Sequence, residues 1–274
     1  MKRFIFLILI SILGISLQTS AQGDLLITPK RIVFEGNKQK AELNLMNIGT
    51  DTATYSVSFR HYNMTEQGKL ELIEKSDTAQ MFADSYLRIF PRQVTLAPGE
   101  AQVVMLQCRR KPGMLAGEYR SHLWFRDEKN YEALGKEKPL LDSNQLSVSV
   151  IAIFGITIPV IIRSGEVNVS ATLSDLKLET QEDTIQYLKL TINRTGNISI
   201  NGKLIVEYIP AQGKPYQVGV VNVGVYTNLN KRDISIKLNK TPGMTFKNGK
   251  LKVRYTSPDE AKYVVYAEAE LVIK

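Results

Sequence analysis

The chain has 274 residues, a formal net charge of +8 at pH 7, 43% hydrophobic residues and one cysteine, Cys108. A single cysteine excludes an internal disulfide, so a packed core must stabilise the fold, and the length suggests two domains of ordinary size. The 35 basic residues are scattered among 27 acidic ones, with Arg109-Arg110-Lys111 as the longest basic cluster. This pattern argues against nucleic acid as a partner.

The first 21 residues, "MKRFIFLILISILGISLQTSA", have the features of a secretory signal peptide. Lys2 and Arg3 form a basic start, an apolar stretch runs from Phe4 to Leu17, and small residues precede a cleavage site after Ala21. The apolar stretch is shorter than the roughly 20 residues that a membrane-spanning helix needs. We therefore expect a cleaved signal peptide at 1–21, no stable membrane insertion, and a mature chain of charge +6 once Lys2 and Arg3 are removed.

The rest of the chain reads as two series of short strands. Alternating or β-branched segments recur with turn residues between them, and helical periodicity is nearly absent. The first series contains "RIVFEGN", "AELNLMNIG", "ATYSVSFRHY", "QVTLAPGE", "AQVVMLQC" and "EYRSHLWF". The second contains "VNVSATL", "YLKLTINRTGN", "GKLIVEYI", "YQVGVVNVGVY", "RDISIKL", "GKLKVRY" and "YVVYAEAELVI". This spacing predicts an all-β protein with one β-sandwich over 22–163 and another over 164–274.

The two series also resemble each other. "LNLMNIGTDTATYSVSF" is similar to "LKLTINRTGNISINGKLIVEY", which places Asn47 against Asn193, and "KPGMLAGEYR" is similar to "TPGMTFKNGKLKVRY", which places Pro112 against Pro242. Turns of this kind recur in many β proteins, but here two features match in the same order. The pattern favours two related sandwiches over one large barrel.

A long apolar segment, "LSVSVIAIFGITIPVII", joins the two series at 146–162. As one strand it would span about 55 Å, whereas most strands have about 5 to 6 residues. Its even positions are all apolar, and before Pro159 it has neither the charges nor the prolines that protect an edge strand. The segment is therefore either the buried last strand of the first sandwich or an edge strand that pairs with another polypeptide.

The first half of the chain resembles the periplasmic pilus (fimbrial) assembly chaperones, on "ITPKRIVFEGN", "AELNLMNIGTDTATYSVSF", "LRIFPRQVTLAPGEAQVVML" and the apolar segment ending in "IPVIIR". The resemblance implies two immunoglobulin-like domains in tandem and a location in the periplasm. It also implies a chaperone that binds a fimbrial or other surface-fibre subunit by donor-strand complementation and passes the subunit on for assembly. In the family the subunit goes to an outer-membrane usher, which is therefore a candidate second partner.

The same resemblance implies a set of site residues. Arg31 falls on the family's basic residue that holds the terminal carboxylate of the subunit, and Pro159 stands where the family has a lysine. Arg163 either replaces that lysine or is an ordinary charge of the linker. The residues that the strand offers to the subunit are Val148, Val150, Ala152, Phe154 and Ile156. A register slip by one residue would offer Ile151 and Ile153 instead.

Catalytic and metal-binding patterns are missing from the sequence. The two histidines, His61 and His122, lie in separate strand segments without carboxylates at ligand spacing. Ser121 and His122 are adjacent in a strand, so their side chains point to opposite faces. We therefore expect no enzyme, no metal and no cofactor. The alternative to a chaperone is a secreted structural or adhesive protein of tandem sandwiches, whose apolar segment is buried within its own domain.

Overall fold

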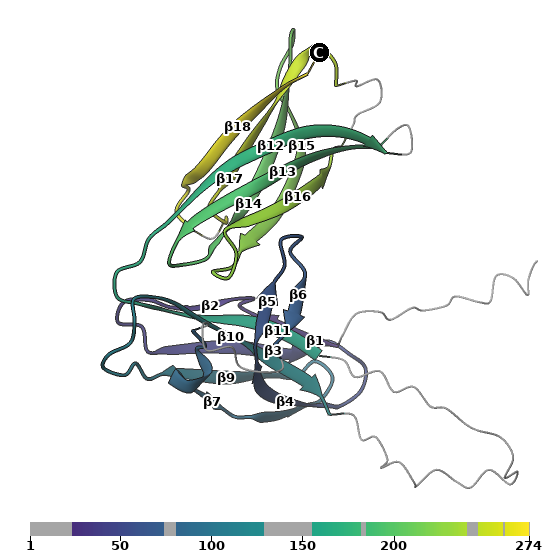
Figure 1. Ribbon diagram of the computed structural model, residues 1–274. Coiled ribbons are helices and arrows are strands. Elements are labelled where there is room, and N and C mark those ends of the chain that lie inside the picture. Colours follow the sequence, from purple (N-terminus) through teal and green to yellow (C-terminus); the bar gives the residue numbers. More distant parts are fainter. Residues whose placement is uncertain are drawn as a thin grey trace, which may run out of the picture.

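The computed structural model describes residues 24–73, 81–128, 155–181, 185–239, 246–259 and 261–273. These residues form two β-sandwiches, stacked one above the other in Figure 1. The predicted all-β fold of tandem sandwiches is confirmed, and the described helical structure is limited to the 3₁₀ turn η1 (Asp84–Tyr86). The expected signal peptide at 1–21 lies outside the described residues.

The first sandwich contains two sheets. One has the strand order β1-β3-β9-β7, with bounds Leu25–Thr28, Lys40–Asn47, Ala101–Cys108 and Leu87–Phe90. The other has the order β2-β11-β10-β4-β8, with bounds Ile32–Phe34, Gly155–Ser164, Gly117–Asp127, Ala53–Arg60 and Gln93–Leu96. All these neighbours are antiparallel except β2 and β11, which run parallel.

Alternate residues of each strand build the core of the first sandwich. Leu43 and Leu45 of β3 and Leu123 of β10 are fully buried there. The even residues of β11 follow the same rule, since Ile158, Val160 and Ile162 are all in this core. The odd residues of β11 and the even residues of β10 must therefore lie on the opposite face of their sheet.

The second sandwich also contains two sheets. One has the order β12-β13-β16, with bounds Val169–Gln181, Ile185–Gly196 and Lys231–Lys237. The other has the order β15-β14-β17-β18, with bounds Tyr216–Val225, Ile200–Pro210, Gly249–Thr256 and Val265–Ile273. Their inner faces enclose a separate core, in which Leu204, Val206 and Tyr255 are fully buried.

A small hairpin forms a two-stranded sheet of its own, separate from the sheets of both sandwiches. It pairs β5 (Tyr62–Met64) with β6 (Leu70–Leu72) and follows directly after β4. Figure 1 shows it rising from the first sandwich toward the β14 and β16 end of the second. This hairpin was not among the strands predicted from the sequence.

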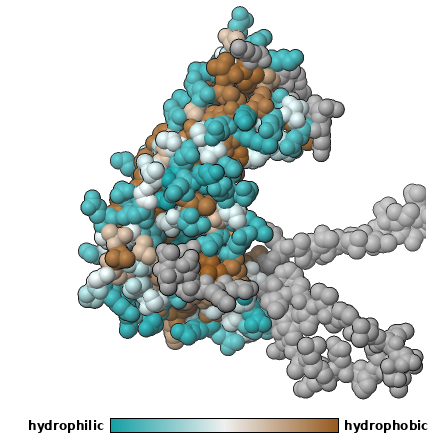
Figure 2. All heavy atoms as spheres, viewed as in Figure 1, coloured by the Kyte–Doolittle hydropathy of each residue, from teal (hydrophilic) through white to brown (hydrophobic). Residues whose placement is uncertain are grey.

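The outer surfaces are mostly hydrophilic in the view of Figure 2, with hydrophobic residues gathered in limited areas. Cross-strand ion pairs explain part of this on β17 and β18, where Lys252 lies 3.2 Å from Glu268 and Lys250 lies 2.9 Å from Glu270. These ion pairs lie on the outer face of the sheet that contains β17 and β18.

Candidate functional site

The outer face of β10 and β11 looks toward the second sandwich. Its β10 residues are Glu118, Arg120, His122 and Trp124, and its β11 residues include Pro159, which pairs with His122, and Arg163, which pairs with Glu118. Because Leu123 and Phe125 point into the core from the same strand, these polar and aromatic side chains are fixed on the interdomain side.

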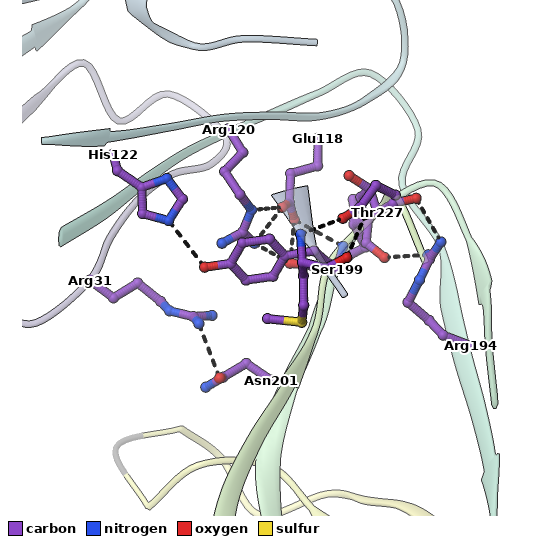
Figure 3. A network of polar contacts seen from close by, with 12 residues as sticks. Arg31, Glu118, Arg120, His122, Arg194, Ser199, Asn201 and Thr227 are labelled. Carbon is purple, nitrogen blue, oxygen red and sulfur yellow. Dashed lines mark hydrogen bonds and ion pairs between the residues drawn. The ribbon is translucent and has the colours of Figure 1, made fainter. Parts of the chain in front are cut away.

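Arg31 lies at the edge of this face, directly before β2. Ile32 pairs with Val160 of β11, so Arg31 comes at the level of Pro159. Its Nη2 donates a hydrogen bond of 3.0 Å to Oδ1 of Asn201 on β14, across the gap between the sandwiches (Figure 3). The predicted anchor residue is thus half-buried and held from the second sandwich.

A second arginine lies within electrostatic range of Arg31. Burial, followed by the positive charge of Arg120, lowers the pKa of Arg31 below its ordinary value, and Arg163 adds a smaller effect of the same sign. Tyr226 and Glu118 act in the opposite direction, and Arg120 is itself paired with Glu118, so Arg31 is the guanidinium that a bound anion would stabilise. The arrangement therefore suits a carboxylate.

Arg120 itself belongs to a buried network between the sandwiches. Its Nε and Nη2 donate to Oε1 of Glu118 at 3.0 and 2.6 Å, and Nη2 also donates to Oγ of Ser199 at 2.6 Å (Figure 3). Ser199 returns two bonds, from its N and Oγ, to Oε2 of Glu118 at 3.0 and 2.7 Å. Glu118 thus accepts four hydrogen bonds, two at each carboxylate oxygen, at one point of domain contact.

The charge state of this network follows from its contacts. Burial alone would raise the pKa of Glu118, but the charge of Arg120 and the hydrogen bonds from Ser199 outweigh it and hold that pKa below the ordinary value. Glu118 is therefore ionised and pairs with Arg120 at neutral pH. Arg120 Nη1 is buried and has no hydrogen-bond partner, so the guanidinium keeps one unused donor group.

His122 and Tyr226 form a neighbouring contact. Nε2 of His122 lies 3.1 Å from Oη of Tyr226, and the Tyr226 ring also stacks under the guanidinium of Arg120 at 3.8 Å. Burial and the charges of Arg120, His61 and Arg31 lower the pKa of His122 to about 3. His122 is thus a neutral, structural group at the interface.

Arg163, the other predicted anchor residue, lies at the far end of the same ladder. Its Nη1 is 3.3 Å from both carboxylate oxygens of Glu35, which follows β2. The described structure joins it to Arg31 only through long-range electrostatics. Arg163 therefore adds positive potential to this end of the sheet while its own ion pair is occupied.

The edge of β11 beside Arg31 is open over half its length. β10 pairs with β11 from Gly155 to Ser164, whereas β2 pairs only with Val160–Ile162. No other strand within the described ranges pairs with Gly155–Pro159 along that second edge. A proline in this place agrees with an edge position, since proline is tolerated mainly on sheet edges.

Most of the predicted donor residues cannot be placed. Val148, Val150, Ala152 and Phe154, as well as the alternatives Ile151 and Ile153, lie outside the described residues. Ile156 is described: it is half-buried, pairs with Phe125 and packs against the first core. It therefore lies on the inner face of the sheet, together with Ile158 and Val160.

A cavity of about 250 Å³ separates the two sandwiches beside the network. Aromatic rings of Tyr62, Phe82 and Tyr226 line it together with the Glu118–Arg120 pair. Within the ranges that the structure describes, no three histidine, cysteine or acidic side chains come together as a metal site. Nor do the described residues include a helix with the length and hydropathy that crossing a bilayer requires.

The Glu118–Arg120–Ser199 network and the contacts of Tyr226 were not predicted from the sequence. One signal was present, because the segment "EYRSHLWF" alternates polar or aromatic residues with core residues, which marks a sheet face that is not simply solvated. Ser199 and Tyr226 come from loops of the second sandwich about 80 to 105 residues further on. Nothing local in the sequence links them to β10.

No protein-family model matches the chain, and no curated protein matches it. Among solved structures, the YadV chaperone has 13% identity and a TM-score of 0.46, over 91% of this chain and all of the other. The CsuC–CsuE chaperone–tip adhesion subunit complex of Acinetobacter baumannii has 12% identity and a TM-score of 0.43, over 89% and 99%. The SafB chaperone complex with SafA pilin of Salmonella enterica has 11% identity and a TM-score of 0.41, over 92% and 97%. The chain is similar to these chaperone structures along most of its length.

Proposed function

We propose that the chain is a periplasmic chaperone that binds a fimbrial or other surface-fibre subunit by lending it the strand at 146–159. The observation that carries the proposal is the open edge of β11 at Gly155–Pro159, which ends beside Arg31. In the sequence, the residues directly before this edge are the apolar and uncharged segment 146–154. A partner strand that pairs with the edge would form backbone hydrogen bonds along it.

The side-chain parity supports the same arrangement. Ile156 and Ile158 are on the inner face of the sheet, so a strand added beside them would extend that face into the partner. The even residues Val148, Val150, Ala152 and Phe154 would then enter the open core of the subunit. Burying four such side chains would contribute roughly 6 to 12 kcal/mol before ordering costs. This is sufficient for specific capture.

Arg31 serves as the anchor for the terminal carboxylate of the subunit. The hydrogen bond to Asn201 uses one Nη2 proton of Arg31, and Glu118 acts on Arg31 through its charge, so the guanidinium has further N–H groups that can donate two parallel hydrogen bonds to a carboxylate. Pro159 carries no charge where the family has a lysine, and the other basic groups that act on Arg31 are Arg120 and Arg163, which are paired with Glu118 and Glu35. Transfer of the subunit through an usher is compatible with this arrangement.

Co-purification tests the proposal. The native chain and the variants Arg31→Ala and Phe154→Asp would be expressed with the fibre subunit encoded nearest to the gene and isolated from the periplasm. Matched controls are Arg88→Ala and Val103→Asp, which change an arginine and an exposed apolar residue on the opposite sheet of the first sandwich. We expect subunit recovery to fall at least tenfold in both site variants only.

The same complex allows a second measurement. Amide hydrogen exchange at Gly155–Thr157 should slow when the subunit is bound, because the open edge gains a partner. Full protection of these amides in the isolated chain, or equal recovery of the subunit by all five proteins, would instead support the structural or adhesive alternative.

A further inference from the structure

The β5–β6 hairpin makes direct contacts with the second sandwich. The side-chain amide of Asn228 donates from Nδ2 to the carbonyl oxygen of Met64 at 2.9 Å and accepts from the Met64 N–H at 3.4 Å. One asparagine side chain thus satisfies both backbone groups of a hairpin residue, as a neighbouring strand would. Met64 is buried there, with 7% of its surface exposed.

A second group of contacts comes from the hairpin turn. The N–H of Asp233, on β16, donates to the carbonyl oxygen of Glu66 at 2.8 Å. The carboxylate of Glu66 also lies 3.3 Å from Nζ of Lys231. Backbone and side-chain contacts therefore hold the same turn residue against the same strand.

Gly68 closes the turn and allows the approach. Its φ of +83° favours glycine, and a Cβ at this position would lie 1.9 Å from Nη2 of Arg232. The guanidinium of Arg232 packs directly against the bare turn and also donates to the carbonyl oxygen of Gly224. Three alternate residues of the hairpin, Met64, Glu66 and Gly68, thus contact the segment from Asn228 to Asp233.

The hairpin is also tied to the polar network at its base. The ring of Tyr62 meets His122 edge-on at 5.0 Å, and His122 contacts Tyr226. The two sandwiches are therefore attached at two separated places, the hairpin turn and the Glu118–Arg120–Ser199 network. One attachment would leave rotation in every direction about itself, whereas two separated attachments leave only a hinge about the line that joins them.

We propose that the β5–β6 hairpin is an interdomain clamp that fixes the second sandwich over the gap, with Asn228 and Lys231 as its receiving residues. Its consequence for the site is that Asn201 of β14 is kept within hydrogen-bond distance of Arg31 and positions that guanidinium. This consequence rests on the proposed function, whereas the clamp itself does not.

The test compares two double variants of the full mature chain. The clamp variant combines Asn228→Ala and Lys231→Ala, which remove the side-chain contacts to Met64 and Glu66. The control variant combines Asn230→Ala and Lys237→Ala, two exposed residues of the same loop and strand. All four side chains lie on the surface of the second sandwich, so both variants should fold.

Two measurements without any client decide the question. Spin labels at Glu42→Cys and Lys262→Cys, in a Cys108→Ala background, report the distance between the sandwiches by electron paramagnetic resonance. We expect the clamp variant to broaden that distance distribution about twofold and to speed amide exchange of Asp233 about tenfold. The control variant should behave as the native chain does.

A distance distribution that is equally narrow in all three proteins, with unchanged exchange at Asp233, would overturn the clamp. Subunit capture gives the separate readout for the proposed function. If Arg31→Ala loses subunit capture but keeps a narrow distance distribution, the result supports the role of Arg31 as anchor and leaves the clamp intact. A broad distribution in the clamp variant supports the clamp whether or not any subunit binds.

Discussion

Nε2 of His122 lies 3.1 Å from the phenolic oxygen of Tyr226, so an uncharged imidazole of the first sandwich is in direct contact with a ring of the second. The groups that face His122 are Arg120 on its own strand, His61 and Tyr62 from the segment after β4, Arg31 before β2, and Tyr226. Burial of the ring and the electrostatic effects of Arg120, His61 and Arg31 all oppose protonation of His122.

This contact predicts a pH dependence of stability. The pKa of His122 is about 3 in the folded chain and 6.5 when unperturbed, so between these values the unfolded chain binds a proton that the folded chain does not. The free energy of unfolding should consequently fall as pH decreases below 6.5, by up to about 1.4 kcal/mol per pH unit from this group. Urea unfolding at pH 7, 6, 5 and 4 would measure it.

The variant His122→Gln should reduce that slope by the amount that one bound proton contributes, about 1.4 kcal/mol per pH unit, because its side chain cannot be protonated in either state. His61→Gln keeps the His122–Tyr226 contact and is the matched histidine control. An undiminished slope in His122→Gln would show that the acid sensitivity originates elsewhere.

The buried ion pair predicts an asymmetric response to mutation. Glu118 and Arg120 have side chains that are 0% and 8% exposed, so Glu118→Gln leaves a buried guanidinium without its counter-charge. We expect the free energy of unfolding to fall by about 3 to 5 kcal/mol. Chemical denaturation at pH 7 measures this loss.

The double variant Glu118→Gln with Arg120→Met should recover a large part of that stability, because the unpaired charge is then absent. If the double variant is instead less stable than Glu118→Gln alone, the penalty does not come from the isolated arginine.

Trp124 provides a spectroscopic prediction at the start of β11. It is the single tryptophan of the chain, its ring stacks 3.2 Å from the guanidinium of Arg60, and a Cβ on Gly155 would lie 2.3 Å from its Nε1. Gly155→Ala should displace the indole, shift its fluorescence emission and cost about 1 to 3 kcal/mol of stability. Ser164→Ala, at the other end of β11, should leave the emission unchanged; superimposable spectra for both would contradict the contact.

The first core predicts a conventional cavity effect. Leu123 is fully buried between the sheets, and Leu123→Ala should lower the free energy of unfolding by about 2 to 5 kcal/mol. Leu115 is 69% exposed in the preceding loop, and Leu115→Ala should change stability by less than about 0.5 kcal/mol. Thermal unfolding of the two variants would compare them directly.

The sequence predicted the strands that carry a sustained alternation. Each of the thirteen segments that were predicted as strands overlaps a strand of the structure. Three- and four-residue strands such as β1, β6 and β7 were missed, since two or three inward residues do not establish a period. The two sandwiches share only part of the contacts that their sequence similarity suggests. Asn47 donates to the carbonyl oxygens of Asp51 and Leu96. In the second sandwich Arg194, which follows Asn193, donates to the carbonyl oxygens of the loop instead.

The site was less predictable than the strands. Arg31 stands in a recognisable local setting, and the structure describes it at the interdomain gap. Arg120 could not be selected from the sequence because its role depends on Ser199 and Tyr226, whose approach is set by the angle between the sandwiches. Local patterns fix which face a side chain takes, but not what a second domain brings to that face.

β2 covers β11 only from Val160 onward, and this short strand acts as a stop. In the proposed complex, a subunit strand beside Gly155–Pro159 would meet Ile32 at the next position. Its last residue would then lie at the level of Arg31. The length of the partner strand would then matter as well as its affinity, because a strand extended by one residue would collide with β2.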